Sequence, residues 1–364
     1  MSQHTLEKRD ANMELLRVLS MCMVLVLHAL LQSGALDRET GGYYIYWTFE
    51  ALCICAVNLF VLISGYFQVE SKFKSRNILK IGIGGVWIYS VVFSFLQILV
   101  KDQPVGKMEL VKACFPLLTK KFWFVNSYLA LYILSPYLNK LLHRLSKKQL
   151  TALSLTFVVL FSIRTTFLPL TWGQDANAGM GILWFITLYC VASWLRICRV
   201  EPEKPLKYWL IYLTATAVLV ASKFVLDKVG VESYSSKLFG YSSIVVLVQS
   251  VALFKAFLHS KPIDGRVGAV ICFAAKHSFS VYIIHFAMWE VLFTKILHID
   301  LWIDNMFSGI AAVLIATVTI FAFCIGVDFV KSVCSNLMGK LLRRTRIANR
   351  YGALMDKWDS VVNE

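Results

Sequence analysis

The sequence predicts an all-α, polytopic membrane protein with about ten transmembrane helices and both termini in the cytoplasm. Its mean hydropathy is +0.64, 58% of its 364 residues are hydrophobic, and only 16% are charged. A typical soluble domain has about a quarter of its residues charged. This composition excludes an ordinary soluble domain and indicates a chain that lies mostly within a bilayer.

Ten apolar runs have the length of about 20 residues that crosses a bilayer core as a helix. No soluble domain follows them, which predicts a single membrane domain. The runs lie at about 13–31, 44–66, 78–100, 122–142, 150–170, 180–198, 207–227, 238–258, 268–295 and 305–330.

Positive charge gives these runs an orientation. With a cytoplasmic N-terminus, 25 of the 37 Lys and Arg residues fall on the cytoplasmic side and nine on the outside. Such a bias is the positive-inside pattern of membrane proteins. The same loops account for the formal net charge of +15, so that charge gives no reason to expect a nucleic-acid partner.

The predicted organisation is a transmembrane domain over residues 1–335, followed by a basic cytoplasmic tail over 336–364. Basic and apolar residues are mixed in the tail, which favours a helix that rests on anionic lipid of the inner leaflet. The nine cysteines contain no C-x-x-C pair and mostly lie inside apolar runs. They indicate neither a disulfide framework nor a zinc site, and no metal is expected.

The first apolar run carries the most informative ionisable residues, which are Glu14, Arg17 and His28. Because an ionisable side chain inside a bilayer is costly, it is a functional candidate. Eleven residues of helix turn through about 1100°, which places Arg17 and His28 on one face and roughly 16 Å apart. Glu14 lies three residues before Arg17, where it can hold the guanidinium. The alternative is a lipid anchor at Arg17 and a core histidine at His28.

Several further segments combine polar residues with apolar runs. They are 12–17, 57–67 with the basic residues of 72–80 after it, 122–139, and 278–285. Together with His28, these segments resemble the acyltransferase 3 superfamily of integral-membrane acyltransferases, from about residue 9 to 335. Within that superfamily, the sequence is similar to bacterial O-acetyltransferases of surface polysaccharides.

The resemblance implies a multi-pass enzyme of the bacterial plasma (inner) membrane. Such an enzyme moves an acetyl group from cytoplasmic acetyl-CoA to a hydroxyl of a cell-surface or lipid-linked glycan. His28 matches the catalytic histidine of the family and Arg17 matches its partner arginine. The expected partners are therefore acetyl-CoA, a glycan and the lipid bilayer.

Two other motifs match the family less closely. Arg76 and Lys80 are the nearest equivalents of a basic motif linked to the acyl donor, with Asn77 where an arginine is expected. Asp328 is the counterpart of a glutamate that ends the last span in many members. Arg17, Arg76 and Lys80 all lie at the inner ends of spans, where an anionic nucleotide can reach them, so we expect them to bind the donor.

The chemistry expected of His28 is general-base catalysis. Acetylation of a sugar needs a base for the hydroxyl proton and a positive or hydrogen-bonding group for the oxyanion. A neutral imidazole suits the first task, and burial away from water favours the neutral form. Glu50 is the candidate carboxylate beside His28, with an interfacial residue that faces water as its alternative. The distance of roughly 16 Å from Arg17 is of the order of an extended pantetheine arm, as direct transfer to the acceptor requires, and a covalent acetyl-His28 relay is the rival route.

Four aromatic or histidine residues of the matching segments are candidates for substrate binding or support. They are Trp123, Tyr128, Tyr282 and His285. Interfacial anchoring also explains Trp123. Hydrogen bonds between neighbouring helices also explain Tyr282 and His285, so both interpretations stay open.

A polytopic transporter or flippase is the alternative class of function, because it would also contain about ten spans and intramembrane charges. Such a protein predicts inverted repeats and interrupted helices in matching halves, and the sequence shows neither. A sensor or structural component that keeps the fold without the chemistry is a third class. The presence of both Arg17 and His28 counts against it.

Overall fold

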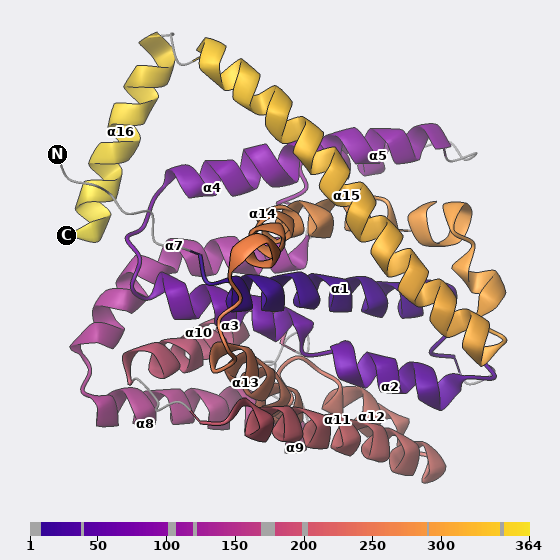
Figure 1. Cartoon of the computed structure of the whole chain (residues 1–364). Coiled ribbons are helices and arrows are strands. Elements are labelled where there is room, and N and C mark those ends of the chain that lie inside the picture. The colour runs from indigo at the N-terminus through magenta and orange to yellow at the C-terminus, as the bar shows by residue number, and fades with distance from the viewer. Residues whose placement is uncertain are drawn as a thin grey trace.

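The computed structural model describes residues 9–37, 40–100, 107–118, 122–168, 179–198, 203–289, 291–342 and 346–364. Over these ranges the chain is helical and contains no strand (Figure 1), which confirms the expected all-α class. The helices are α1 (Ala11–Ser33), α2 (Tyr43–Cys53), α3 (Ala56–Gln68), α4 (Arg76–Ile81), α5 (Ile88–Val100), α6 (Lys107–Cys114), α7 (Trp123–Arg144), α8 (Lys147–Val158), α9 (Arg164–Phe167), α10 (Ile182–Ile197), α11 (Pro205–Lys228), α12 (Glu232–Leu238), α13 (Ile244–Leu258), α14 (Gly265–Ala287), α15 (Met306–Leu342) and α16 (Arg346–Asn363). The π-helical segments Gly82–Trp87, Val159–Ile163 and Val291–Ile296 and the 3₁₀ turn Ile299–Trp302 complete them.

Among the described residues, seven helices are long and apolar enough to cross a membrane. The other three expected spans are also helical. Of these, α10 and α13 are shorter than the roughly 20 residues that a perpendicular crossing needs. The third, α7, contains 22 residues but is less apolar. The seven are Ala11–Ser33, Tyr43–Gln68, Arg76–Leu96, Lys147–Phe167, Pro205–Lys228, Gly265–Ala287 and Met306–Leu337.

One of the predicted runs has nearly the expected bounds, and two do not. The run 44–66 corresponds to the membrane-long segment Tyr43–Gln68, within which a turn at Ile54 and Cys55 separates α2 from α3. The run 268–295 ends as an α-helix at Ala287 and continues as a separate π-helical turn. The run 305–330 extends far beyond its expected end, since no proline stops α15 before Leu342.

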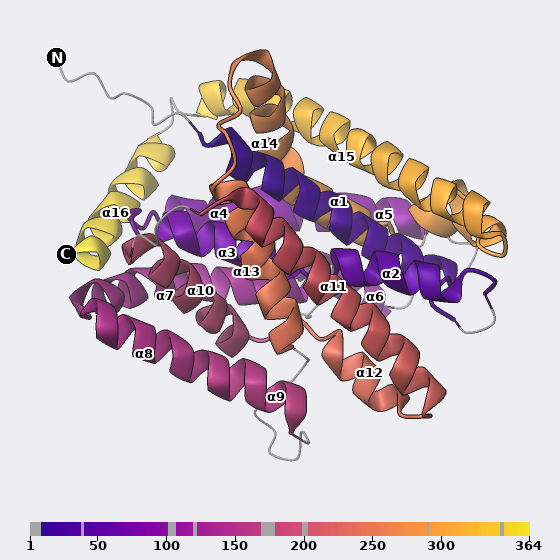
Figure 2. The same ribbon diagram turned by 60° about the horizontal axis from the view of Figure 1, so that its bottom comes forward.

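Strong local signals fix both ends of α1. The side chain of Asp10 accepts hydrogen bonds from the backbone N–H groups of Asn12 and Met13, as an N-cap residue does. Gly34 follows the last turn with a φ of 73°, in the left-handed region that glycine adopts without strain. α1 then packs against α2, α3, α14 and α15, which makes it the central helix of the bundle (Figures 1 and 2).

The bundle has two different ends. We call the end where α1 begins and α16 lies the tail end, and the opposite end, where α1 finishes, the loop end (Figure 1). Asn12 near the start of α1 donates to the carbonyls of Ser260 and Lys261 at 3.0 and 3.1 Å. The segment between α13 and α14 therefore also lies at the tail end.

α15 runs through residue 336, where the basic tail is expected to begin, and ends at Leu342. The last helix, α16, docks on the segment before α4. Asp359 accepts a hydrogen bond from the Ser75 backbone N–H at 2.8 Å, and Asn363 exchanges two hydrogen bonds with the Phe73 backbone at 2.9 and 3.0 Å. One face of the expected lipid-facing helix is thus occupied by protein.

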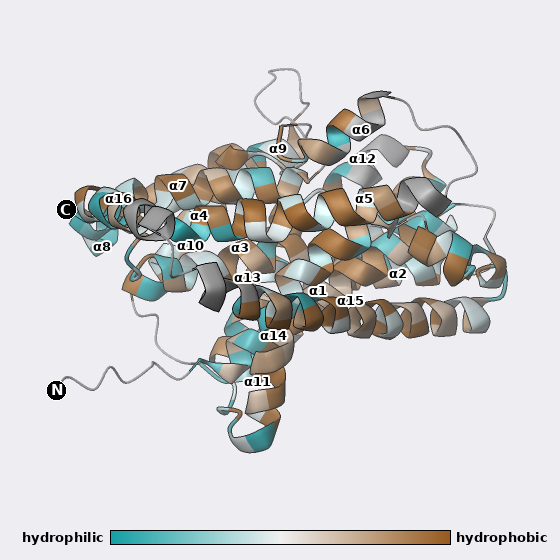
Figure 3. Ribbon diagram, turned by 90° about the horizontal axis from the view of Figure 1, so that it is seen from above, coloured by the Kyte–Doolittle hydropathy of each residue, from teal (hydrophilic) through white to brown (hydrophobic). Residues whose placement is uncertain are grey.

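Large apolar side chains remain exposed on the outer helices. Leu155 on α8, Leu213 on α11 and Val318 on α15 are 58%, 52% and 69% exposed. The residues of α15 are mostly hydrophobic along its visible length (Figure 3). A contiguous apolar surface of this kind is the expected contact with lipid in a membrane protein.

Candidate active site

His28 and His285 meet in the bundle interior. Nδ1 of His28 on α1 lies 2.8 Å from Nε2 of His285 on α14. Nδ1 of His285 in turn lies 2.8 Å from the carbonyl oxygen of Val281, one helical turn earlier. His285 is completely buried, whereas His28 keeps part of its surface accessible. His285 is thus held in place by burial and by its bond to Val281, whereas the imidazole of His28 is partly accessible.

The hydrogen bonds assign the tautomers of both rings. A carbonyl oxygen only accepts, so Nδ1 of His285 carries the proton that it donates to Val281. In the neutral ring, Nε2 of His285 is then an acceptor, and Nδ1 of His28 must donate to it. Nε2 of His28 is left with its lone pair. This is the arrangement that a general base requires.

Aromatic rings surround the two histidines. Trp289 meets the His28 ring edge-on at 5.6 Å between centroids, and Phe286 lies 5.8 Å away. Tyr282 contacts the His285 ring at 5.9 Å. These apolar walls restrict the orientation of the pair and lower its exposure to water.

Arg17 occupies the same helix closer to the tail end. It forms an ion pair with Glu14 one turn earlier, as the sequence spacing predicts. Its side chain is 28% exposed, so part of the guanidinium remains reachable. Its positive charge also acts on Tyr128 of α7, which places that tyrosine near the arginine.

Arg76 and Lys80 are not joined to Arg17 by any hydrogen bond among the residues that the structure describes. The Arg76 guanidinium donates to both carboxylate oxygens of Asp356 on α16, each at 2.8 Å. Lys80 lies near enough to Lys331 for their charges to interact. The expected donor residues thus form a dispersed basic region at the tail end and not one preformed cradle.

Glu50 does not form a hydrogen bond with His28. Within the described ranges, one of its carboxylate oxygens is buried and has no hydrogen-bond partner. It lies near Tyr241, whose ring stacks on Trp123 at 5.7 Å. The expected partner of His28 is therefore replaced by the imidazole of His285, and Glu50 faces a different group of aromatic residues.

Trp123, Tyr128 and Tyr282 belong to one aromatic cluster. Phe124 stacks on Tyr128 at 6.0 Å and contacts Tyr282 at 5.5 Å. Trp123 is partly buried and contacts the rings of Phe124 and Phe185. The cluster joins α7 to the helix that carries His285.

Asp328 lies at the centre of a second polar cluster. It accepts hydrogen bonds from the hydroxyl of Tyr89 on α5 and from Nδ1 of His277 on α14. Lys331, one turn later, has its ammonium 3.9 Å from the carboxylate and also donates to the carbonyl of Gly84. Asp328 does not end the last span, because α15 continues for several turns beyond it.

The sequence reasoning missed His277 as the partner of Asp328. It also missed Asp356 as the partner of Arg76. Each pair joins two different helices, and only the presence of ionisable residues in or beside apolar runs pointed to them. No group of three or more metal-ligating side chains occurs in the described part of the chain.

A comparison with protein families identifies the family of the chain. The model of the acyltransferase 3 family, described as an acyltransferase domain, matches residues 10–328. The chain therefore belongs to this family, and it is a membrane acyltransferase. No match was found among curated proteins or among solved structures. The matched range contains the histidine pair and Asp328, whereas α16 lies beyond it.

Proposed function

We propose that the protein is an O-acetyltransferase that moves acetyl groups from cytoplasmic acetyl-CoA to a glycan hydroxyl on the outer side of a bacterial plasma membrane. The observation that carries this proposal is the chain from Val281 through His285 to His28. It leaves Nε2 of His28 as an unprotonated base at a partly accessible position. Family membership supplies the acyl transfer.

In the proposed reaction, the acceptor hydroxyl gives its proton to Nε2 of His28 while its oxygen attacks the thioester carbonyl carbon. The oxyanion that forms collapses, the C–S bond breaks, and the thiolate of CoA takes the proton from His28. The sugar gains an acetyl ester, and the base returns to its first state. A covalent acetyl-His28 intermediate is the rival route.

The donor is proposed to enter from the tail end. Arg17 lies roughly 16 Å along α1 from His28, which matches a pantetheine arm that reaches from bound phosphates to the base. Arg76 and Lys80 add positive charge for the nucleotide phosphates. Asp356 competes with the donor for the Arg76 guanidinium, so binding requires that ion pair to open.

The acceptor is proposed to approach from the loop end. The partly buried carboxylate of Glu50 can accept hydrogen bonds from sugar hydroxyls, and the stacked rings of Trp123 and Tyr241 offer an apolar face. This mixture of rings and few polar groups is typical of small-molecule sites.

The proposed topology has ten crossings and places the tail end in the cytoplasm. The seven long helices supply most of the crossings, and α7, α10 and α13 supply the rest. The excess of Lys and Arg in the tail-end loops and the tail supports this orientation. A transporter or flippase remains the alternative, but membership of an acyltransferase family disfavours it.

Oriented membrane vesicles test both the base and the direction of transfer. Labelled acetyl-CoA is supplied on the face that carries the tail, and the host surface glycan is enclosed on the opposite face. The wild-type protein should acetylate the enclosed glycan, and His28→Gln should reduce the rate at least about a hundredfold. His143→Gln, which changes an exposed histidine of α7, is the matched control.

Protein amount and thermal midpoint must be equal in the two variants for the comparison to count. Wild-type rates in His28→Gln would eliminate the general-base role. Acetyl groups found only on glycan supplied to the tail side would eliminate the transmembrane direction and leave the base unaffected. Mass spectrometry of the glycan identifies the acyl group in each case.

A further inference from the structure

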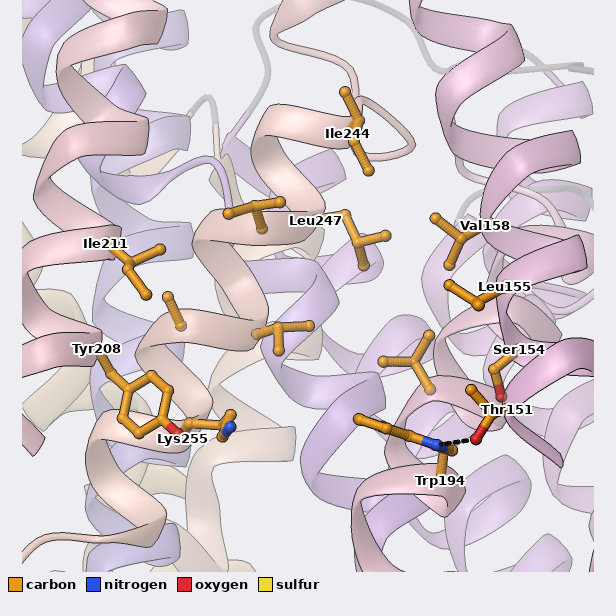
Figure 4. A pocket seen from close by; sticks show the side chains of 14 residues that line it. Thr151, Ser154, Leu155, Val158, Trp194, Tyr208, Ile211, Ile244, Leu247 and Lys255 are labelled. Atoms are coloured by element: carbon orange, nitrogen blue, oxygen red, sulfur yellow. Dashed lines mark hydrogen bonds between the residues drawn. The ribbon is translucent and has the colours of Figure 1, made fainter. Parts of the chain in front are cut away.

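A groove on the side of the bundle is apolar along most of its length (Figure 4). It lies between α8, α10, α11 and α13 and has a volume of about 380 Å³, within the usual range of small-molecule sites. Leu155 and Val248, which line it, are 58% and 43% exposed. Because such exposed side chains of a membrane protein face lipid, the groove opens toward the bilayer.

The two ends of the groove differ. Val158 and Ile244 lie at one end, and Tyr208 and Lys255 lie together at the other (Figure 4). Lys255 belongs to the last turn of α13, so this second end is at the tail end of the bundle, where the helix ends approach the lipid headgroups. The groove therefore has apolar walls and one basic end. We call this end, formed by Tyr208 and Lys255, the basic rim.

Tyr208 supplies an unsatisfied polar group at that rim. Only 4% of this residue is exposed, and its hydroxyl has no hydrogen-bond partner among the residues that the structure describes. A buried hydroxyl without a partner is unfavourable, because it has lost its bonds to water. A ligand atom that accepts a hydrogen bond would satisfy it.

Lys255 supplies the charge. Its ammonium lies 4.3 Å from the centroid of the Tyr208 ring and forms no ion pair within the described ranges. The nearby Glu203 is already paired with Lys207. Burial, together with the positive charge of Lys255, lowers the pKa of His259, whose ring stacks on Tyr208 at 5.6 Å. The rim therefore presents one unpaired cation beside neutral hydrogen-bonding groups.

We propose that this groove binds an anionic phospholipid from the leaflet at the tail end, with one acyl chain along the apolar walls and the phosphate at Lys255 and Tyr208. The walls offer little to a sugar or a nucleotide, which need polar partners along their whole length. A zwitterionic lipid would fill the same walls but carries an ammonium that Lys255 repels. The site is separate from His28 and does not depend on the proposed reaction.

Native mass spectrometry of the full-length protein can test the site. The protein is released from nanodiscs that contain phosphatidylglycerol and phosphatidylcholine with identical acyl chains. We expect one phosphatidylglycerol to be retained in preference to phosphatidylcholine. Lys255→Gln should weaken its retention about tenfold, and Tyr208→Phe about threefold, because the first removes a charged hydrogen bond and the second a neutral one.

Lys148→Gln provides the matched control, since it removes an exposed lysine from the tail end of α8 without touching the groove. Val248→Trp should fill the groove and reduce retention of both lipids. Unchanged thermal midpoints show that each variant is folded. Equal retention of the two lipids, or equal losses in Lys255→Gln and Lys148→Gln, would overturn the proposal. Displacement of phosphatidylglycerol by an equal amount of polyprenyl phosphate would also overturn it, because the named occupant would be wrong.

Discussion

Two histidines of α14 differ in the hydrogen-bond partner that a neighbouring helix provides. His277 and His285 lie two turns apart, and both are almost completely buried. His277 bonds through Nδ1 to the carboxylate of Asp328, whereas His285 bonds through Nε2 to the imidazole of His28. His277 is thus part of a polar cluster around a carboxylate, whereas His285 accepts a hydrogen bond from the partly exposed imidazole of His28.

The difference lies in the partners. Asp328 also binds Tyr89 and lies near Lys331, so its cluster connects α5, α14 and α15. His28 has no carboxylate partner within the described residues, and its Nδ1 donates to Nε2 of His285. We therefore expect a buried histidine of this membrane protein to act as a structural connection when a carboxylate holds it, and as a positioning group when it faces another imidazole.

Among the substitutions that test this comparison, the largest loss of activity should come from one at His285. His285→Leu removes the acceptor that fixes Nδ1 of His28, so both tautomers of His28 become accessible. We expect kcat to fall about ten- to a hundredfold, with little change in the KM for acetyl-CoA. His285→Gln keeps an acceptor oxygen and should recover part of the loss, which a purely structural role would not predict. Steady-state kinetics of the purified variants measures both parameters.

The second effect concerns the cluster around Asp328. Asp328→Asn weakens the bonds to Tyr89 and His277 and should lower the free energy of unfolding by about 2 kcal/mol. Activity per folded molecule should change less than it does in His285→Leu. Thermal unfolding followed by activity measurements separates the two quantities, with the exposed Asp300→Asn as control. A loss of activity as large as that of His285→Leu, at unchanged stability, would show that the His277–Asp328 pair affects catalysis as much as His285 does.

The smallest effect is expected at the exposed ion pair of α16. Asp356→Asn should cost less than about 1 kcal/mol of stability, because exposed ion pairs contribute little. If Arg76 binds donor phosphates, its release from Asp356 should raise the affinity for acetyl-CoA about threefold. Calorimetry on detergent-solubilised protein measures this change. Asp356→Asn should not change the affinity for acetyl-CoA in an Arg76→Ala background. An equal rise in affinity there would show that Arg76 does not bind the donor.

Features within one helix were predictable from the sequence. Helix geometry fixes the rotation and rise between residues, so the pairing of Glu14 with Arg17 followed from their spacing. The approximate positions of the spans followed from their length and apolarity. Helix breaks were harder to predict, because the interruption at Ile54 and Cys55 contains no proline or glycine.

By itself, the sequence determined that this chain enters a membrane and that it carries an arginine and a histidine on one face of its first helix. Composition and helix periodicity are local properties, which no distant residue changes. Only the tertiary structure decided that His28 pairs with His285 and not with Glu50, and that Arg76 pairs with Asp356. These partners are separated by 257 and 280 residues, and their contact depends on the rotation and depth at which each helix packs.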